Sequence, residues 1–309
     1  MLADQMASQG NRPRILLVLT ELQGRGTEHL ERAALLAKAM GLSLRLAWNG
    51  EDKWTGHTPV YRLEKLARSL RRHFDLPVDV VREPLNSLDV LKFHGKSCDL
   101  VCIPFQGERK WSATQWVERL LRARVGPILV VGTKGGVPYQ RVLVSTSLKS
   151  DCSQRLQWAH ALAKAGSIDL LHSVDSPVPP SEKDDPASGA VLEHLRRKTW
   201  LEAHRLMASV ARQLPGQGPA QAVSFICEDG KPLARILQRQ ASTDYGLIAI
   251  GVTTQPRWMF LRRASLATQL IAAACTDTLI VPGEPTKKML GREGVIWKWV
   301  SWLREDRFA

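Results

Sequence analysis

The chain has 309 residues, 44% of them hydrophobic, and this length allows two domains of about 130 to 150 residues that each bury a core. The 43 Lys and Arg outnumber the 30 Asp and Glu, giving a net charge of +13, which favours nucleic acid, anionic lipid or acidic proteins without selecting among them. Because no apolar run reaches about 18 residues and no leader pattern opens the sequence, we expect a soluble cytoplasmic protein without a transmembrane segment.

The first half of the sequence alternates between strand and helix patterns. Residues 14–19 form an apolar run typical of a strand buried on both faces, and residues 27–40 follow a helical period that stops before Gly41. Further strands are expected at residues 43–48, 78–82, 100–103 and 128–131, with helices at residues 60–74, 88–94 and 114–124. Strands alternating with helices over short connections predict an open parallel five-stranded sheet with helices on both faces.

The same order recurs after a Gly- and Pro-containing break at residues 132–140. The expected strands are residues 141–144, 168–172, 222–226, 247–250 and 278–281, and the expected helices are residues 153–165, 190–214, 232–240 and 265–275. Residues 177–188 are predicted to form a loop over the carboxyl ends of the strands, where open α/β sheets bind ligands. The fold class is therefore α/β, with two tandem Rossmann-like units at residues 12–133 and 139–283 and an amphipathic Trp-rich tail at residues 284–309.

Several segments of the second half resemble the universal stress protein family. They are the first strand at residues 142–144, the stretch 171–177 after the second strand, residues 228–232 before the third helix, and residues 247–251 leading to 265–271 and 278–281. The first half is similar but more diverged. The resemblance is to tandem, two-domain members within the nucleotide-binding α-hydrolase-like superfamily. It implies that the two halves pair through their last strands, residues 128–131 and 278–281. It also implies a possible homodimer through the same strands.

The resemblance places an adenine-nucleotide site at the end of the fourth strand of the second half. Family members that bind ATP carry a glycine, a second glycine three positions later and a third followed by Ser or Thr, because small residues let backbone N–H groups approach phosphates. Those positions fall on Gly251, Thr254, Ala264 and Ser265 with the family spacing intact. Thr254 adds a branched side chain where a backbone approach is needed, so this motif is degenerate.

Other residues of the same resemblance complete this candidate site. Arg262 and Arg263 could hold an anion or form a solvated basic loop, and Val174 belongs to the motif after the second strand. Ser147 stands where binding members carry an acidic residue that contacts the base or ribose, and a neutral hydroxyl supplies no charge-assisted acceptor. The site could hold ATP or another nucleotide, hold another small or lipid-like ligand, or be empty.

The matching loop of the first half is further from the family pattern. Its positions fall on Pro104, Gly107, Thr114 and Gln115 with a shortened spacing, and Thr20 replaces the acidic residue. Proline has no N–H to donate, so we expect no nucleotide there.

The remaining patterns indicate binding rather than catalysis. No hydrolase elbow, phosphate loop, paired carboxylates or metal-ligand spacing occurs, and His172 at a strand end is expected to be hydrogen-bonded rather than catalytic. We therefore predict a non-enzymatic stress-response or regulatory protein with no required cofactor, acting as a binding or scaffolding module. Two alternatives are an ATP-binding protein acting through the second domain and a nucleic-acid-binding module, and the Trp-rich tail could dock on its own domain, a protein partner or an anionic membrane surface.

Overall fold

A computed structural model describes residues 14–20, 22, 28–48, 58–105, 110–132, 138–146, 152–163, 166–174, 186–212, 222–253 and 266–283. The strands are β1 (Ile15–Thr20), β2 (Ser43–Trp48), β3 (Val78–Val80), β4 (Leu100–Pro104), β5 (Ile128–Val131), β6 (Arg141–Thr146), β7 (Ser167–Val174), β8 (Val223–Asp229), β9 (Leu247–Thr253) and β10 (Asp277–Gly283). The helices are α2 (Glu28–Met40), α3 (Pro59–Phe74), α4 (Leu88–Lys96), α5 (Lys110–Ala123), α6 (Ser153–Ala163), α7 (Pro186–Ala211), α8 (Pro232–Ser242) and α9 (Leu266–Ala273). None of the helices in these ranges is long and apolar enough to cross a bilayer.

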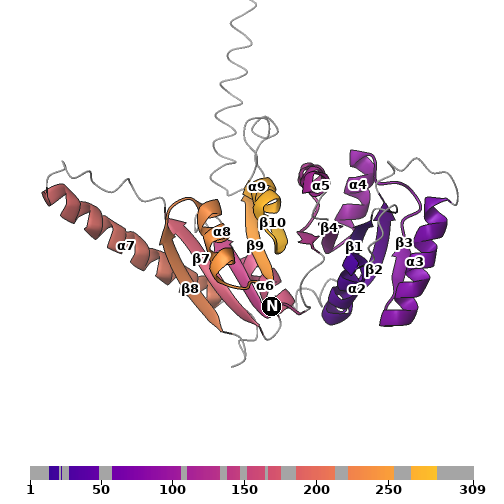
Figure 1. The fold of residues 1–309 in the computed structure, drawn as a ribbon, viewed down its shortest axis with the longest axis horizontal. Coiled ribbons are helices and arrows are strands. Elements are labelled where there is room, and N and C mark those ends of the chain that lie inside the picture. The colour runs from indigo at the N-terminus through magenta and orange to yellow at the C-terminus, as the bar shows by residue number, and fades with distance from the viewer. Residues whose placement is uncertain are drawn as a thin grey trace, which may run out of the picture.

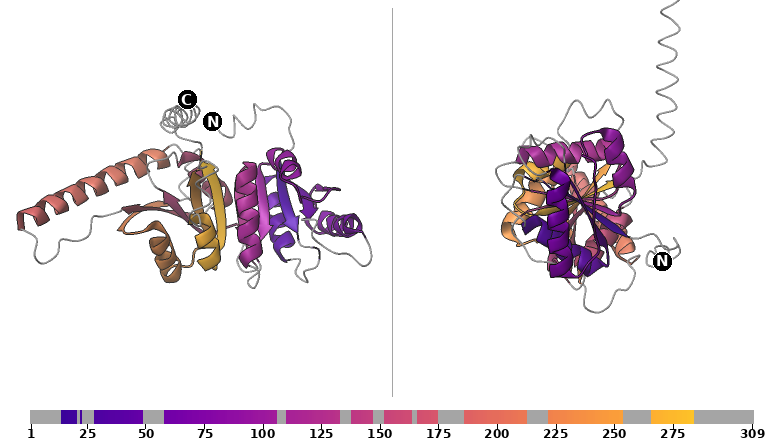
Figure 2. Two further views of the ribbon diagram at one scale, coloured as in Figure 1. Left: turned by 90° about the horizontal axis from the view of Figure 1, so that it is seen from above. Right: turned by 90° about the vertical axis from the view of Figure 1, so that its right-hand side faces the viewer.

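All of these strands belong to one ten-stranded sheet in the order β3-β2-β1-β4-β5-β10-β9-β6-β7-β8. Within each half the strands run parallel, and the two halves meet where β5 and β10 pair antiparallel, with Leu279 opposite Leu129. Figures 1 and 2 show the two halves side by side along the long axis of the molecule. The α/β class predicted from the sequence is confirmed, and the two five-stranded units form one continuous sheet through β5 and β10.

The central strands β1, β4 and β5 are almost wholly apolar because helices cover both faces of the sheet. Alternate residues of β1 point to opposite sides, so Leu16 and Val18 join the core beneath α2, α3, α6 and α7, whereas Leu17 and Leu19 join the core beneath α4, α5, α8 and α9. This alternation explains why the buried strands show continuous apolar runs in the sequence.

Two helices begin earlier than the sequence pattern indicated. Helix α5 starts at Lys110 rather than at Thr114, so Thr114 and Gln115 lie inside the helix and their N–H groups are not at its open end. Helix α7 starts at Pro186, inside the stretch predicted to be a loop, because proline suits the first turn of a helix.

A buried polar cluster connects the two halves at their junction through hydrogen bonds and an ion pair. The carboxylate of Asp277, at the start of β10, forms an ion pair with Arg32 of α2 and accepts hydrogen bonds from Tyr139 Oη (2.7 Å) and Gly132 N (2.9 Å). Arg32 Nη1 also donates to the Gly132 carbonyl at 2.7 Å. Burial, together with the neighbouring carboxylate, raises the pKa of Tyr139 well above its usual value, so the phenol remains a donor.

The pairing predicted for the last strands of the two halves is confirmed by the register of β5 and β10. Strand β5 is also paired with β4, and β10 with β9. Because each strand is flanked on both sides within the chain, a homodimer through these two strands would find no open edge.

Candidate functional site

The strand order places a crevice between β6 and β9 in the second half. There the chain reverses its direction of travel across the sheet, from β6 to β7 and β8 on one side and to β9 and β10 on the other. Open α/β sheets bind ligands at the carboxyl ends of the strands at such a point. The crevice is therefore the position from which a nucleotide site would be built.

Two of the predicted site residues lie at this end of the sheet. Gly251 is near the carboxyl end of β9, opposite Val281 of β10, and Val174 ends β7 in a largely buried position. The other predicted site residues lie outside the described residues: Ser147, Thr254, Arg262, Arg263, Ala264 and Ser265.

Arg155 fills the space beside Gly251. It lies in the first turn of α6 and is only 5% exposed, and its Nη1 donates a hydrogen bond to the carbonyl of Ser145 near the end of β6. A Cβ added to Gly251 would stand 2.6 Å from Arg155 Nε and closer still to Cζ and Nη2. One guanidinium thus spans the crevice from β6 to β9.

This arrangement gives Gly251 a role within the protein itself. Its φ lies outside the left-handed region, so the backbone does not require glycine here. What requires the absence of a side chain is the close approach of the Arg155 guanidinium. The side of Gly251 where a Cβ would stand is covered by the buried Arg155 guanidinium.

Arg155 was missed in the sequence analysis, although the sequence contains a signal for it. Arg155, Ala159 and Leu162 share one face of α6, and all three are buried. A charged residue at an apolar position of an amphipathic helix indicates a buried contact for its head group. Sequence spacing alone does not identify Ser145 and Gly251 as its neighbours, since they come from two other elements.

The histidine singled out in the sequence is hydrogen-bonded as expected. His172 Nδ1 lies 3.0 Å from the carbonyl of Thr146, to which it donates across β6 and β7. In the first half, Pro104 ends β4 opposite Val131, and Thr20 is buried at the end of β1. Gly107 lies outside the described residues.

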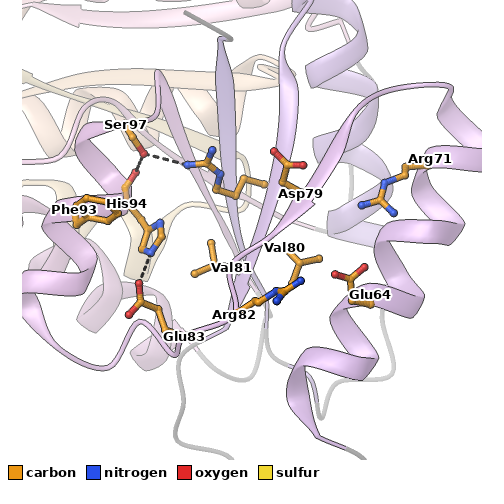
Figure 3. Close-up of a pocket in the computed structure, with 11 residues that line it drawn as sticks. Glu64, Arg71, Asp79, Val80, Val81, Arg82, Glu83, Phe93, His94 and Ser97 are labelled. Atoms are coloured by element: carbon orange, nitrogen blue, oxygen red, sulfur yellow. Dashed lines mark hydrogen bonds and ion pairs between the residues drawn. The ribbon is translucent and has the colours of Figure 1, made fainter.

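A second hollow opens beside the edge of the sheet in the first half, away from the predicted site (Figure 3). It measures about 670 Å³ and is lined mainly by charged residues, namely Arg45, Arg71, Arg82, Glu64, Asp79 and Glu83, together with Phe93 and His94. His94 Nε2 pairs with Glu83 Oε1 at 2.8 Å, and Arg45 Nη1 donates to Ser97 Oγ at 3.1 Å. These contacts satisfy part of the charge locally, and the sequence held no motif that indicated the hollow.

A comparison with known protein families matches the second half of the chain. Residues 138–282 match the Universal stress protein family. The second half is therefore similar to this family over its whole length. No curated protein matched the chain.

Several solved structures, among them a universal stress protein, share the fold over most of the chain. A universal stress protein from Archaeoglobus fulgidus aligns at 14% identity over 87% of this chain and 98% of its own, with a TM-score of 0.57. A functionally unknown protein from Pseudomonas aeruginosa aligns at 16% identity over 90% and 94% with a TM-score of 0.63. A putative universal stress protein from the same species aligns at 16% identity over 90% and 95% with a TM-score of 0.58.

Proposed function

We propose that this chain is a non-catalytic stress-response protein of the universal stress protein type, acting as a binding or scaffolding module whose nucleotide crevice is closed by Arg155. The observation that carries the proposal is the Arg155 guanidinium, hydrogen-bonded to the Ser145 carbonyl and packed on Gly251. The family match of residues 138–282 supports the stress-response assignment.

The closed crevice follows from steric and electrostatic reasoning. A phosphate bound at this end of the sheet must approach the Gly251 backbone closely, and the guanidinium already stands there at 5% exposure. Moving it would break its bond to the Ser145 carbonyl, and hydrogen bonds to charged groups contribute about 1.5–3 kcal/mol each. A nucleotide would have to offset this cost before it gained any contact.

An adenine-nucleotide-binding protein is the second candidate, and the family match over the second half favours it. In this alternative Arg155 would swing away from Gly251 and bind the phosphates itself, since arginine forms strong bidentate contacts with phosphate oxygens. The two candidates differ in whether Arg155 excludes the nucleotide or recruits it.

The test is to purify the full chain under native conditions, denature it and analyse the released small molecules by mass spectrometry. We expect no stoichiometric nucleotide, and titration calorimetry of the purified chain with ATP should show no binding heat. Stoichiometric nucleotide would refute the closed crevice. In that event, loss of the nucleotide on Arg155→Ala would establish the second candidate, and retention on combined Gly251→Val and Ser265→Ala would place the site elsewhere.

A further inference from the structure

The ten-stranded sheet has two edges, formed by β3 and β8. An edge strand presents unpaired N–H and C=O groups, and natural proteins usually protect such a row. The two edges of this sheet are protected to very different degrees.

Strand β3 is short and partly covered. It has three residues, and Leu44 N donates to Pro77 O while Val81 N donates to Leu46 O, so Val78 and Val80 turn their backbone groups outward. The outward carbonyl of Val78 accepts hydrogen bonds from Nε (2.9 Å) and Nη2 of Arg71. Little of this edge is left for another strand.

Strand β8 is longer, and no other described strand lies along its outer edge. Ile168 N donates to Ala222 O, and Gly230 N donates to Val174 O, which turns the backbone groups of Val223, Phe225, Cys227 and Asp229 away from β7. Arg235 Nε donates a hydrogen bond to the carbonyl of Asp229. No hydrogen bond from another described residue reaches the outward backbone groups of Val223, Phe225 and Cys227.

A hollow on helix α7 adjoins this open edge. It measures about 510 Å³ and is lined by Trp200, Leu201 and His204 with Glu193 and Arg197. His204 Nδ1 lies 3.5 Å from the thiol of Cys227, so the hollow lies next to β8. Helix α7 projects past the sheet on this side in Figures 1 and 2, and Leu201 is 53% exposed.

We propose that a second copy of this chain docks on β8, with the two β8 strands pairing antiparallel about a two-fold axis at Phe225. Phe225 would then exchange both backbone hydrogen bonds with the partner's Phe225, and Val223 would pair with the partner's Cys227. The pairing places the Phe225 ring beside the partner's Phe225 ring, a favourable cross-strand combination, and places the apolar side chain of Val223 beside the partner's Cys227. The two α7 helices lie on the same face of the extended sheet, where each hollow adjoins the partner.

The charges of β8 select this direction of pairing. Its acidic residues, Glu228 and Asp229, stand together at the carboxyl end. In the antiparallel arrangement they lie beyond the paired stretch and opposite the amino end of the partner strand, whose Ala222 is neutral. A parallel arrangement would bring the two acidic ends together, and like charges side by side are destabilising, an effect that the ion pair between Glu228 and Arg239 reduces.

The test measures the mass of the full chain by analytical ultracentrifugation over a dilution series. We expect a dimer for the natural sequence and a monomer for Val223→Pro, since proline removes one outward N–H and an edge strand tolerates it. The matched control is Val80→Pro, which removes an outward N–H from the β3 edge and should stay dimeric. A monomeric natural chain, a dimeric Val223→Pro chain, or loss of the dimer in the control would overturn the proposal.

Hydrogen exchange keeps the proposal testable if Val223→Pro fails to fold, as circular dichroism would reveal. In the natural chain, the amides of Val223, Phe225 and Cys227 should become more protected as the protein concentration rises. Exchange at these amides that does not change with concentration would overturn the pairing at β8.

Discussion

Replacing Gly251 by alanine tests whether the glycine serves Arg155. The added Cβ would lie 2.6 Å from Arg155 Nε and nearer still to Cζ and Nη2, whereas unstrained carbon contacts lie about 3.5–4.0 Å apart. The guanidinium must therefore move by about 1 Å or more. Because it is buried and bound to the Ser145 carbonyl, it cannot move without losing that hydrogen bond.

The expected cost follows from the contact that is lost. A hydrogen bond to a charged group contributes about 1.5–3 kcal/mol, and overpacking a buried site costs about 1–3 kcal/mol. We expect Gly251→Ala to lower the free energy of unfolding by about 2–3 kcal/mol. Gly126→Ala is the control, since its Cβ would lie 3.5 Å from the nearest atom, and it should change stability by less than about 0.5 kcal/mol.

Urea unfolding followed by circular dichroism measures these differences as a double-mutant cycle. In an Arg155→Ala background, Gly251→Ala should cost less than about 0.5 kcal/mol, giving a coupling energy of about 2 kcal/mol between the two positions. If Gly251→Ala costs the same with and without the arginine, the glycine is required for another reason and the closed-crevice interpretation fails.

The polar cluster at the junction supports two further predictions. Tyr139→Phe removes the 2.7 Å hydrogen bond to Asp277 and should lower the free energy of unfolding by about 1.5–3 kcal/mol in urea, whereas an unchanged midpoint would contradict the role of the phenol. Alkaline pH should also unfold the chain, because burial raises the pKa of Tyr139 well above 10 and that of Tyr245 to about 12. In the unfolded chain both phenols ionise near pH 10, so their contribution to stability is complete below pH 10 and is lost as the pH rises towards 12 and beyond. Above pH 10, Tyr139 alone should lower the free energy of unfolding with a slope that approaches about 1.4 kcal/mol per pH unit. Tyr139→Phe should reduce that slope in urea titrations at pH 9 to 11 (about one unit either side of the phenol pKa), and an unchanged slope would contradict this assignment.

The alternation of strands and helices was predictable because strands covered on both faces are apolar throughout. Such runs identified β1, β4 and β5, whereas β7, β8 and β9 extend beyond their predicted carboxyl ends. An apolar pattern does not reveal where such a strand ends, because strand pairing is made by backbone hydrogen bonds and continues through the polar residues near the end.

The contacts that decide the site could not be predicted in the same way. Arg32 and Asp277 are 245 residues apart, and the neighbours of Arg155 lie on β6 and β9. Sequence spacing indicates which residues share a face of one element and does not indicate which elements bring charges together. The family motif assigned Gly251 to a nucleotide site, which stays a prediction, and it gave no indication that the Arg155 guanidinium packs against this glycine.

The cluster at Asp277 also explains why the halves join in one register. Strand β5 and residues 279–281 of β10 are apolar, and apolar antiparallel strands tolerate slippage unless other groups define their alignment. A shift of the pairing would move the Asp277 carboxylate away from Tyr139, Gly132 N and Arg32, and leave a buried charge without partners, which costs about 3–5 kcal/mol. The ion pair therefore acts mainly against wrong registers. Because this junction keeps β5 and β10 paired within the chain, neither strand offers an edge to a second copy, whereas among the described strands β3 and β8 form the edges of the sheet.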